Sequence, residues 1–366
     1  MIEQLRYATT PKYNFPQSLH GLQLPQKFIE SSLRSMRNME DESFQPNESG
    51  FKQYATSHQQ NFEGATPILR THDLLTIKSI PIKPLFCDTP VAAVDVSSIK
   101  IGETETGLLC AIRGAIVWKH DSRYSYLRFG PFPFHITEEN KKEIYNLFKH
   151  HSFEISEDAN APNLANVPIR MGSLLERWLQ LGISCSAHDS VILWDGSLTA
   201  GTADSPLNVV SQLLEISRNR LNTILAFSKT TNLRLLGHKL TDLGEKSWPP
   251  CLLQINGFPP QSGPVFSLGN VYVAKLTQGI CSFRLDIDKE ISLERGIEAV
   301  QKLLGNDLLI QSYPETLRLA HTFSTFTATE VIGIQHLIAQ QYGLRIIARP
   351  NIRRLLFGPF GKGSEG

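Results

Sequence analysis

Two apolar stretches decide the fold that the sequence predicts: Val91-Ala92-Ala93-Val94-Asp95-Val96 and Val191-Ile192-Leu193-Trp194-Asp195-Gly196. Each is a short, continuous apolar run, which is typical of a strand buried inside a sheet. Each also contains one aspartate, and a carboxylate in an apolar strand is costly to bury unless it is paired or binds a metal. Taken alone, either aspartate also fits a strand-end residue that reaches solvent or caps a turn.

Strands and helices are predicted around these two runs. Residues 108–119 and 124–129 continue the first run as an antiparallel meander, and further strands are predicted at 223–228, 271–276 and 282–287. Helices are predicted over 137–151, 170–182, from 205, over 291–304, after Pro314 and over 328–341. The pattern indicates an α/β domain with a mixed sheet flanked by helices.

The chain is predicted to have three parts. Residues 1–85 are rich in Gln, Ser, Asn and His and form an N-terminal arm, partly helical or poorly ordered, with one amphipathic helix near 28–36. Residues 86–345 form the α/β domain. Residues 346–366 are a basic C-terminal tail, which fits either a solvated chain end or a segment that follows phosphates.

Composition limits the class of protein. The 366 residues include 36 Lys and Arg against 35 Asp and Glu, which excludes a histone-like protein but not a local basic groove. The five cysteines contain no C-x-x-C motif, so a disulfide framework is not expected and a reducing compartment fits. Without a signal-like N-terminus or an apolar run of membrane length, we expect a cytoplasmic protein with no membrane partner.

A third acid joins the two strand aspartates. Glu176 lies on the helix before the second strand, so the chain order is a strand with Asp95, a helix with Glu176 and a strand with Asp195. That order is the layout of a ribonuclease-H-like sheet. Carboxylate oxygens suit Mg²⁺ or Mn²⁺. Two such ions about 3.5–4 Å apart can activate water and stabilise a leaving oxygen in phosphodiester cleavage.

Three further residues have two interpretations each. His321, one turn into a helix, is a natural fourth member of the acidic site, although a lone histidine there is more often a packed or capping residue. Lys229 ends a strand and is either solvated or a phosphate contact near the metal site. Arg284 either pairs with Asp286 or Asp288, or lines a nucleic-acid groove.

The ordered set of motifs resembles the NurA nuclease family of prokaryotic DNA-end-processing enzymes. The similar segments are AAVDVSS (92–98), the helix with Glu176, VILWDGSL (191–198), AFSKTTNL (226–233), YVAKL with FRLDI (272–287) and YPETLRLAH (313–321). They cover roughly 90–341. The Asp-Val-Ser of the first motif departs from the family's more frequent Asp-Gly-Ser, and Arg284-Leu285-Asp286 replaces a frequent Arg-x-Glu.

The resemblance implies a ribonuclease-H-like fold and a metal-dependent DNA nuclease. It implies 5′→3′ exonuclease and single-strand endonuclease activity with Mn²⁺ (or Mg²⁺), in end resection of DNA double-strand breaks. It also implies a homodimer that docks on a hexameric HerA-type translocase. Carried over by position, Asp95, Glu176, Asp195 and His321 are metal ligands, with Lys229 as an auxiliary cation. Two rival hypotheses remain: a non-catalytic DNA-binding or translocase-docking subunit, and a ribonuclease or transposase-like enzyme.

Overall fold

Three parallel strands lie at the centre of the sheet: β4 (Val91–Thr104), β7 (Val191–Asp195) and β9 (Thr223–Ser228). The computed structural model describes residues 23–37, 39, 42–47, 53–55, 76–152, 161–202, 204–231, 233–235, 237–256 and 265–347. The three strands are apolar along most of their length because helices cover both faces of the sheet. Both strands predicted from the aspartate-bearing runs are confirmed.

Antiparallel strands flank this parallel centre. On one side, β5 (Gly107–His120) pairs with β4 and β6 (Arg123–Thr137) pairs with β5, which confirms the predicted meander. On the other side, β15 (Phe283–Asp288) pairs with β9 and is followed by β14 (Gly269–Lys275), β12 (Cys251–Asn256) and β3 (Thr76–Pro81). The sheet is therefore mixed, as predicted.

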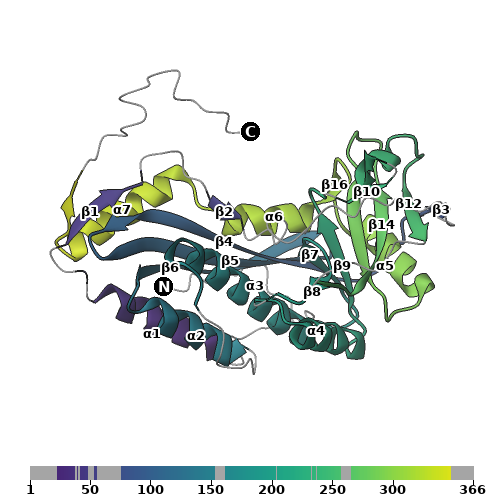
Figure 1. Cartoon of the computed structure of the whole chain (residues 1–366). Helices are drawn as coiled ribbons and strands as arrows, with labels where there is room; N and C mark the ends of the chain where they lie inside the picture. Colours follow the sequence, from purple (N-terminus) through teal and green to yellow (C-terminus); the bar gives the residue numbers. More distant parts are fainter. Residues whose placement is uncertain are drawn as a thin grey trace, which may run out of the picture.

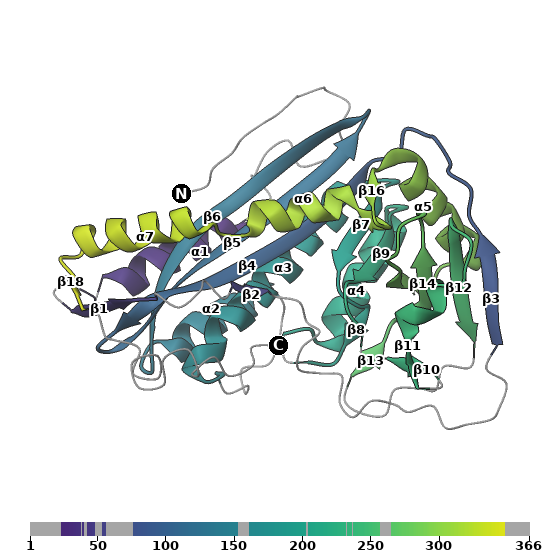
Figure 2. The same cartoon turned by 90° about the horizontal axis from the view of Figure 1, so that it is seen from above.

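Helices form a layer on each face of the sheet (Figure 1). One layer contains α1 (Gln23–Met36), α2 (Lys141–Ser152), α3 (Val167–Ser186) and α4 (Leu207–Asn219). The opposite face is covered by α5 (Leu293–Asn306) and α6 (Glu315–Ser324), with α7 (Ala328–Gln341) continuing along the far half of β4 (Figure 2). The helices predicted after Pro314 and over 328–341 are confirmed.

Each face of the sheet has its own apolar core. Val94 and Trp194 belong to the core under α3, whereas Ala93 and Leu193 belong to the core under α6. This division follows from the strand geometry, because successive side chains point to opposite faces. It fixes the face to which every polar residue of β4 and β7 points.

Short elements complete the described structure. The remaining strands are β1 (Ser43–Pro46), β2 (Gln53–Ala55), β8 (Thr199–Ala200), β10 (Arg234–Leu235), β11 (His238–Lys239), β13 (Phe266–Ser267), β16 (Leu309–Ile310), β17 (Tyr313–Pro314) and β18 (Arg345–Ile346). Two 3₁₀ helices span Leu164–Asn166 and Leu240–Gly244. None of the described helices has the length and apolar character needed to cross a membrane.

The N-terminal arm differs from its prediction. Its helix is confirmed within α1, but the arm also supplies β1 and β2, which pair with β4, and β3, which pairs with β12. These strands are short and their partners are distant in sequence, so no local alternation marks them. The basic tail lies outside the described residues apart from Ile346 and Ile347.

Candidate metal centre

Asp95 and Asp195 lie side by side on neighbouring parallel strands. Val94 of β4 is in register with Trp194 of β7, and each aspartate is the next residue in its strand. Both aspartates therefore point to the face covered by α6. β7 ends at Asp195, and the following Gly196 has a φ of 118°, a left-handed conformation that favours glycine.

Helix α6 adds two polar side chains above Asp95. The His321 Nδ1 atom lies 3.4 Å from Asp95 Oδ2, and the Ser324 hydroxyl donates a hydrogen bond to the same oxygen. One ligand atom each from Asp95, Asp195 and His321 falls within 4.8 Å of the others. The structure thus brings together three of the four metal ligands that the sequence predicts.

Lys229 lies at the end of β9, next to the two aspartates. Its Nζ atom is 2.6 Å from Asp195 Oδ2 and 5.7 Å from the centre of the Tyr313 ring. The Lys229 side chain is 37% exposed, whereas that of Asp195 is 10% exposed. The lysine therefore bridges the buried carboxylate and solvent, and its role as an auxiliary cation stays a prediction.

Tyr313, to which no role was assigned from the sequence, borders Lys229 and the two aspartates. Its hydroxyl is buried and makes no hydrogen bond within the described structure. Burial, together with the negative charges of Asp195 and Asp95, raises the pKa of Tyr313 well above its ordinary value. Buried hydroxyls are nearly always hydrogen-bonded, so the Tyr313 hydroxyl is an exception among the described residues, and it lies within the electrostatic influence of both carboxylates. The only sequence signal was its position in the segment that leads to His321.

Burial dominates the electrostatics of Asp195. Burial raises the pKa of its carboxyl group, and the nearby charge of Asp95 raises it further, while Lys229 and His321 oppose the shift. Two carboxylates on one face of a sheet repel each other unless a cation lies between them. The site is therefore short of positive charge even with Lys229 in place.

The donor set fits a divalent cation. It offers two carboxylates, with Asp95 8% and Asp195 10% exposed, and one imidazole nitrogen. The Nδ1 atom of His321 is buried and forms no hydrogen bond in the described part of the chain, so it is available as a ligand. Carboxylates suit Mg²⁺ and Mn²⁺, and an imidazole suits transition metals, so the donor set is compatible with more than one divalent ion.

Glu176 is not brought into this group. It lies on α3, whose apolar residues belong to the core on the other face of the sheet. Its Oε1 atom accepts a hydrogen bond of 3.1 Å from Gln180, and it lies beside the buried Arg177. The sequence identified the helix correctly but could not give the distance from its glutamate to the strand ends. The role of Glu176 as a metal ligand stays a prediction.

Arg284 is buried, which corrects its prediction as a nucleic-acid contact. Its side chain is 2% exposed and makes two hydrogen bonds to the Asp286 carboxylate, of 2.7 and 2.8 Å. Asp286 in turn accepts from the backbone amide of Leu198, in the loop after β7. Arg284 therefore pairs with Asp286, one of the two interpretations of its sequence, and supports the chain that follows Asp195.

A buried arginine fixes the end of α6. Arg113 of β5 donates from Nη1 to the carbonyl of Thr325 at 3.1 Å, and its Nη2 lies 2.9 Å from Glu330 Oε1. Its guanidinium also lies 4.3 Å from the centre of the Phe326 ring. These contacts hold the link between α6 and α7, just beyond His321.

A second group of metal-ligating residues contains Asp88, His120 and Asp121. Asp88 lies 2.8 Å from Nε2 of His120 and Asp121 lies 3.6 Å from Nδ1. The two carboxylates therefore face different ring nitrogens. With its two nitrogens facing two different carboxylates, the imidazole of His120 bridges Asp88 and Asp121 across its ring.

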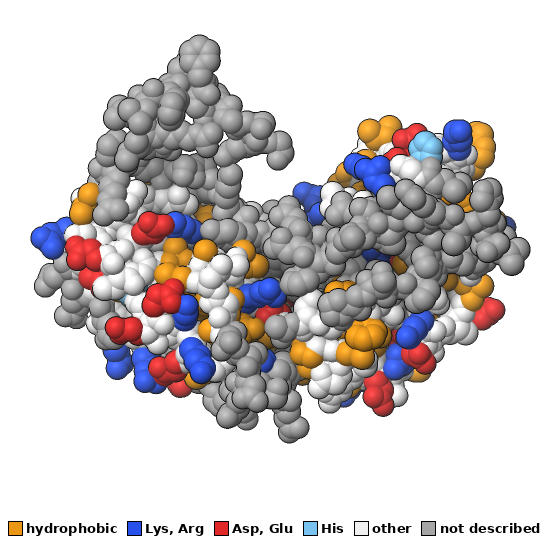
Figure 3. Space-filling view, in the orientation of Figure 1, with side chains coloured by type: hydrophobic (Ala, Val, Ile, Leu, Met, Phe, Trp, Pro, Cys, Tyr) orange, Lys and Arg blue, Asp and Glu red, His pale blue; other side chains and the backbone are white. Residues whose placement is uncertain are grey.

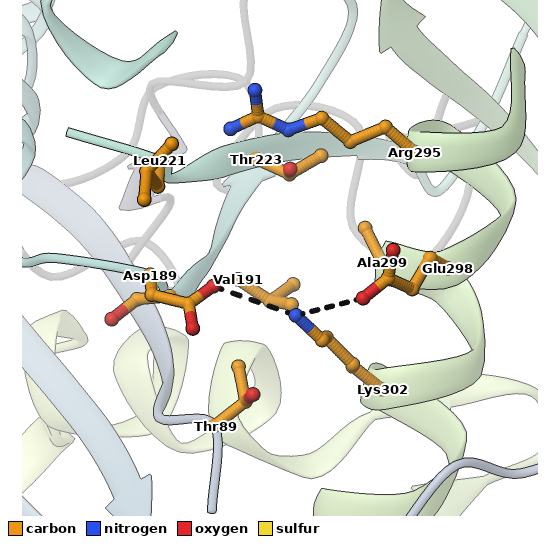
Figure 4. Close-up of a pocket in the computed structure, with 10 residues that line it drawn as sticks. Thr89, Asp189, Val191, Leu221, Thr223, Arg295, Glu298, Ala299 and Lys302 are labelled. Carbon is orange, nitrogen blue, oxygen red and sulfur yellow. Dashed lines mark hydrogen bonds and ion pairs between the residues drawn. The ribbon is translucent and has the colours of Figure 1, made fainter. Parts of the chain in front are cut away.

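A cavity of about 280 Å³ lies between α5 and the loops before β4, β7 and β9 (Figure 4). It is at the opposite end of these strands from Asp195. Lys302 points into it and lies 3.4 Å from Asp189 and 3.1 Å from Glu298, so its charge is matched within the protein. The cavity is thus separate from the aspartate pair.

Charges of both signs are interspersed on the described surface of the face in Figure 3. This agrees with the near-neutral composition. The described surface of this face therefore offers no continuous basic patch to a polyanion, and contact with one would depend on local groups such as Lys229.

Comparisons with known proteins include a distant structural match. No protein-family model matches the chain, and no curated protein matches it in sequence. Among solved structures, it is similar to endonuclease V from Bacillus subtilis, with a TM-score of 0.33 and 11% sequence identity. The match covers 72% of this chain and 88% of that chain. With so low a score, the function has to be argued from the residues of this chain.

Proposed function

We propose that this protein is a metal-dependent nuclease that hydrolyses phosphodiester bonds of DNA. The observation that carries the proposal is the convergence of Asp95, Asp195 and His321 within 4.8 Å, from two neighbouring strands and a helix. Lys229 and the unpartnered hydroxyl of Tyr313 border the same group. Buried carboxylates beside an imidazole and a lysine are the groups that phosphoryl chemistry uses.

The finer assignment rests on the sequence motifs. We propose a NurA-type nuclease on a ribonuclease-H-like sheet, acting with Mn²⁺ as a 5′→3′ exonuclease and single-strand endonuclease in end resection. A homodimer that docks on a HerA-type translocase is part of this proposal. Its support is the order of the motifs along the chain, from Asp95 to His321.

Each residue has a distinct task in this scheme. A divalent cation held by Asp95, Asp195 and His321 would supply Lewis-acid activation of water and of the phosphate. Ser324 orients the Asp95 carboxylate through its hydrogen bond. Lys229 offers a positive charge to a phosphate oxygen. His321, which is 40% exposed, is either a ligand or the group that carries a proton.

The test is cleavage of DNA labelled at the 5′ or the 3′ end, single- and double-stranded, with Mn²⁺, Mg²⁺ or EDTA. The variants are Asp195→Asn and, as a matched control, Asp121→Asn in the other acidic group. We expect metal-dependent cleavage that Asp195→Asn abolishes and Asp121→Asn keeps. The two labels report polarity, and competition with RNA separates a deoxyribonuclease from a ribonuclease.

Two results would contradict the proposal. Full activity of Asp195→Asn would remove the aspartate pair from the reaction. No cleavage by folded wild-type protein with any metal, together with intact DNA binding, would favour the non-catalytic DNA-binding or docking subunit.

A further inference from the structure

The Lys229 ammonium lies against the carboxylate that a metal would need. Its Nζ atom is 2.6 Å from Asp195 Oδ2, which is hydrogen-bond distance. Asp195 is also one of the three residues whose ligand atoms lie within 4.8 Å of one another. A cation bound by Asp195 and the ammonium of Lys229 would therefore share one small volume and the same negative charge.

Two cations cannot both keep this position. At such separations an ammonium and a divalent ion repel each other, and the repulsion is larger inside a partly buried site than in water. Asp195 is only 10% exposed, so water does not screen the pair fully. The lysine has a flexible stem and a 37% exposed side chain, so it is the partner that can move.

We propose that Lys229 is the resident counter-ion of Asp195 in the metal-free site, and that metal binding displaces it from this carboxylate. This inference rests on the proposed function, because it assumes the metal site at Asp95, Asp195 and His321. It adds a regulatory role to the lysine: the protein's own charge competes with the metal and limits its affinity.

The Tyr313 ring offers the displaced Lys229 ammonium a second binding position. The ring centre is 5.7 Å from Nζ, which is inside the range of a cation–π contact. Swinging from the carboxylate toward the ring keeps the ammonium beside the site, where a phosphate would lie. Metal loading and exposure of a positive charge to substrate are therefore coupled events.

The proposal predicts that loss of the Lys229 charge raises the metal affinity of the site, whereas loss of a supporting residue would lower it. Removing its charge should tighten metal binding, since the metal no longer competes with it. A unit charge about 5 Å from a divalent ion, even at the dielectric constant of water, corresponds to at least about a tenfold change in affinity. A lysine that merely supports the fold would have no such effect.

The experiment measures Mn²⁺ affinity of the full metal-free chain from the electron paramagnetic resonance signal of free Mn²⁺. The variants are Lys229→Met, Lys229→Gln, Lys229→Arg and, as a matched loss of charge elsewhere, Lys246→Met, an exposed residue. We expect both neutral variants at Lys229 to bind Mn²⁺ at least about tenfold more tightly. Lys229→Arg and Lys246→Met should stay within about twofold of wild type.

The outcomes separate this inference from the proposed function. If wild type binds Mn²⁺ and the neutral variants bind it equally or more weakly, the counter-ion role is wrong while the metal site stands. If wild type binds no Mn²⁺ and Asp195→Asn gives the same result, both proposals fail. Circular dichroism of each variant establishes that it is folded. Because two different neutral replacements are made at Lys229, the test still stands if one of them does not fold.

Discussion

Arg113 donates a hydrogen bond of 3.1 Å to the carbonyl oxygen of Thr325, the residue that follows helix α6. The arginine comes from β5 and is 3% exposed. Because α6 carries His321 and Ser324, this contact sets how far the helix end lies from Asp95. A residue that touches neither metal nor substrate thus positions two that surround the site.

Replacing this arginine should weaken the metal site. Lysine in Arg113→Lys cannot reach Thr325 and Glu330 at once, because it lacks the planar fork of a guanidinium. We expect about a tenfold loss of Mn²⁺ affinity, as for other groups that orient ligands. The free energy of unfolding should fall by about 1–3 kcal/mol. Calorimetry and urea unfolding measure the two effects, and unchanged Mn²⁺ affinity in an unstable variant would limit Arg113 to a structural role.

Glu330 should make stability depend on pH in acid. Burial raises its pKa, but hydrogen bonds from Arg113 and from the Thr327 backbone outweigh this and lower it from 4.5 to about 2. A lowered folded-state pKa means stability that is present above pH 4.5 and lost as pH falls toward 2. Urea unfolding across this window should show a steeper loss for wild type than for Glu330→Gln. If the free energies of unfolding of wild type and Glu330→Gln change with pH in the same way, solvent screens the ion pair between Glu330 and Arg113.

Asp195→Asn should separate stability from metal binding. Since the pKa of Asp195 is raised by burial and by Asp95, its ionised form disfavours the folded, metal-free protein as pH rises above 3.8. We expect the variant to melt about 1–3 °C higher than wild type at neutral pH without metal. Mn²⁺ should stabilise wild type and leave the variant unchanged. A lower melting temperature would show that the pair with Lys229 outweighs the cost of burial.

Tyr313→Phe tests the unpartnered hydroxyl. The change removes no hydrogen bond within the described structure, so we expect the melting temperature to stay within about 1 °C of wild type or to rise. Cleavage should slow at least about tenfold if the hydroxyl meets substrate or its water. Single-turnover rates with saturating Mn²⁺ measure this. A variant with wild-type rates would make Tyr313 only a platform for Lys229.

Glu176→Gln tests the fourth predicted ligand. The amide oxygen of the new side chain can still accept from Gln180, so the fold should be kept. Because Glu176 is outside the group of Asp95, Asp195 and His321, we expect Mn²⁺ affinity within about twofold of wild type. Mn²⁺ titration decides this. A loss comparable with that of Asp195→Asn would instead place the glutamate among the ligands.

The sequence was informative where local patterns determine contacts. The apolar runs around Asp95 and Asp195 specify buried parallel strands, and such strands put equivalent residues side by side. Pro314 and the apolar spacing after it specify the helix that carries His321. These features account for the sheet centre and three of the predicted ligands.

Other contacts depend on distances that no local pattern contains. The Tyr313 ring meets Lys229 only because a short hairpin, β16 and β17, aims it at the end of β9. Arg284 alternates with apolar residues as a solvent-facing residue would, yet the face to which it points is buried. The strands β1 and β2 have only four and three residues, which is too short to show a clear period of two.

The turn after β7 makes the backbone surroundings of the two aspartates different. Asp95 lies within a strand that continues to Thr104, whereas Asp195 ends its strand at a glycine in the left-handed region. A β-carbon at Gly196 would touch nothing within 4 Å, so a larger residue there would strain the backbone without a clash. Asp95 therefore has sheet residues on both sides along its strand, whereas Asp195 is the last paired residue before the turn. A substitution at Gly196 is therefore expected to shift Asp195 relative to Asp95 without removing either carboxylate.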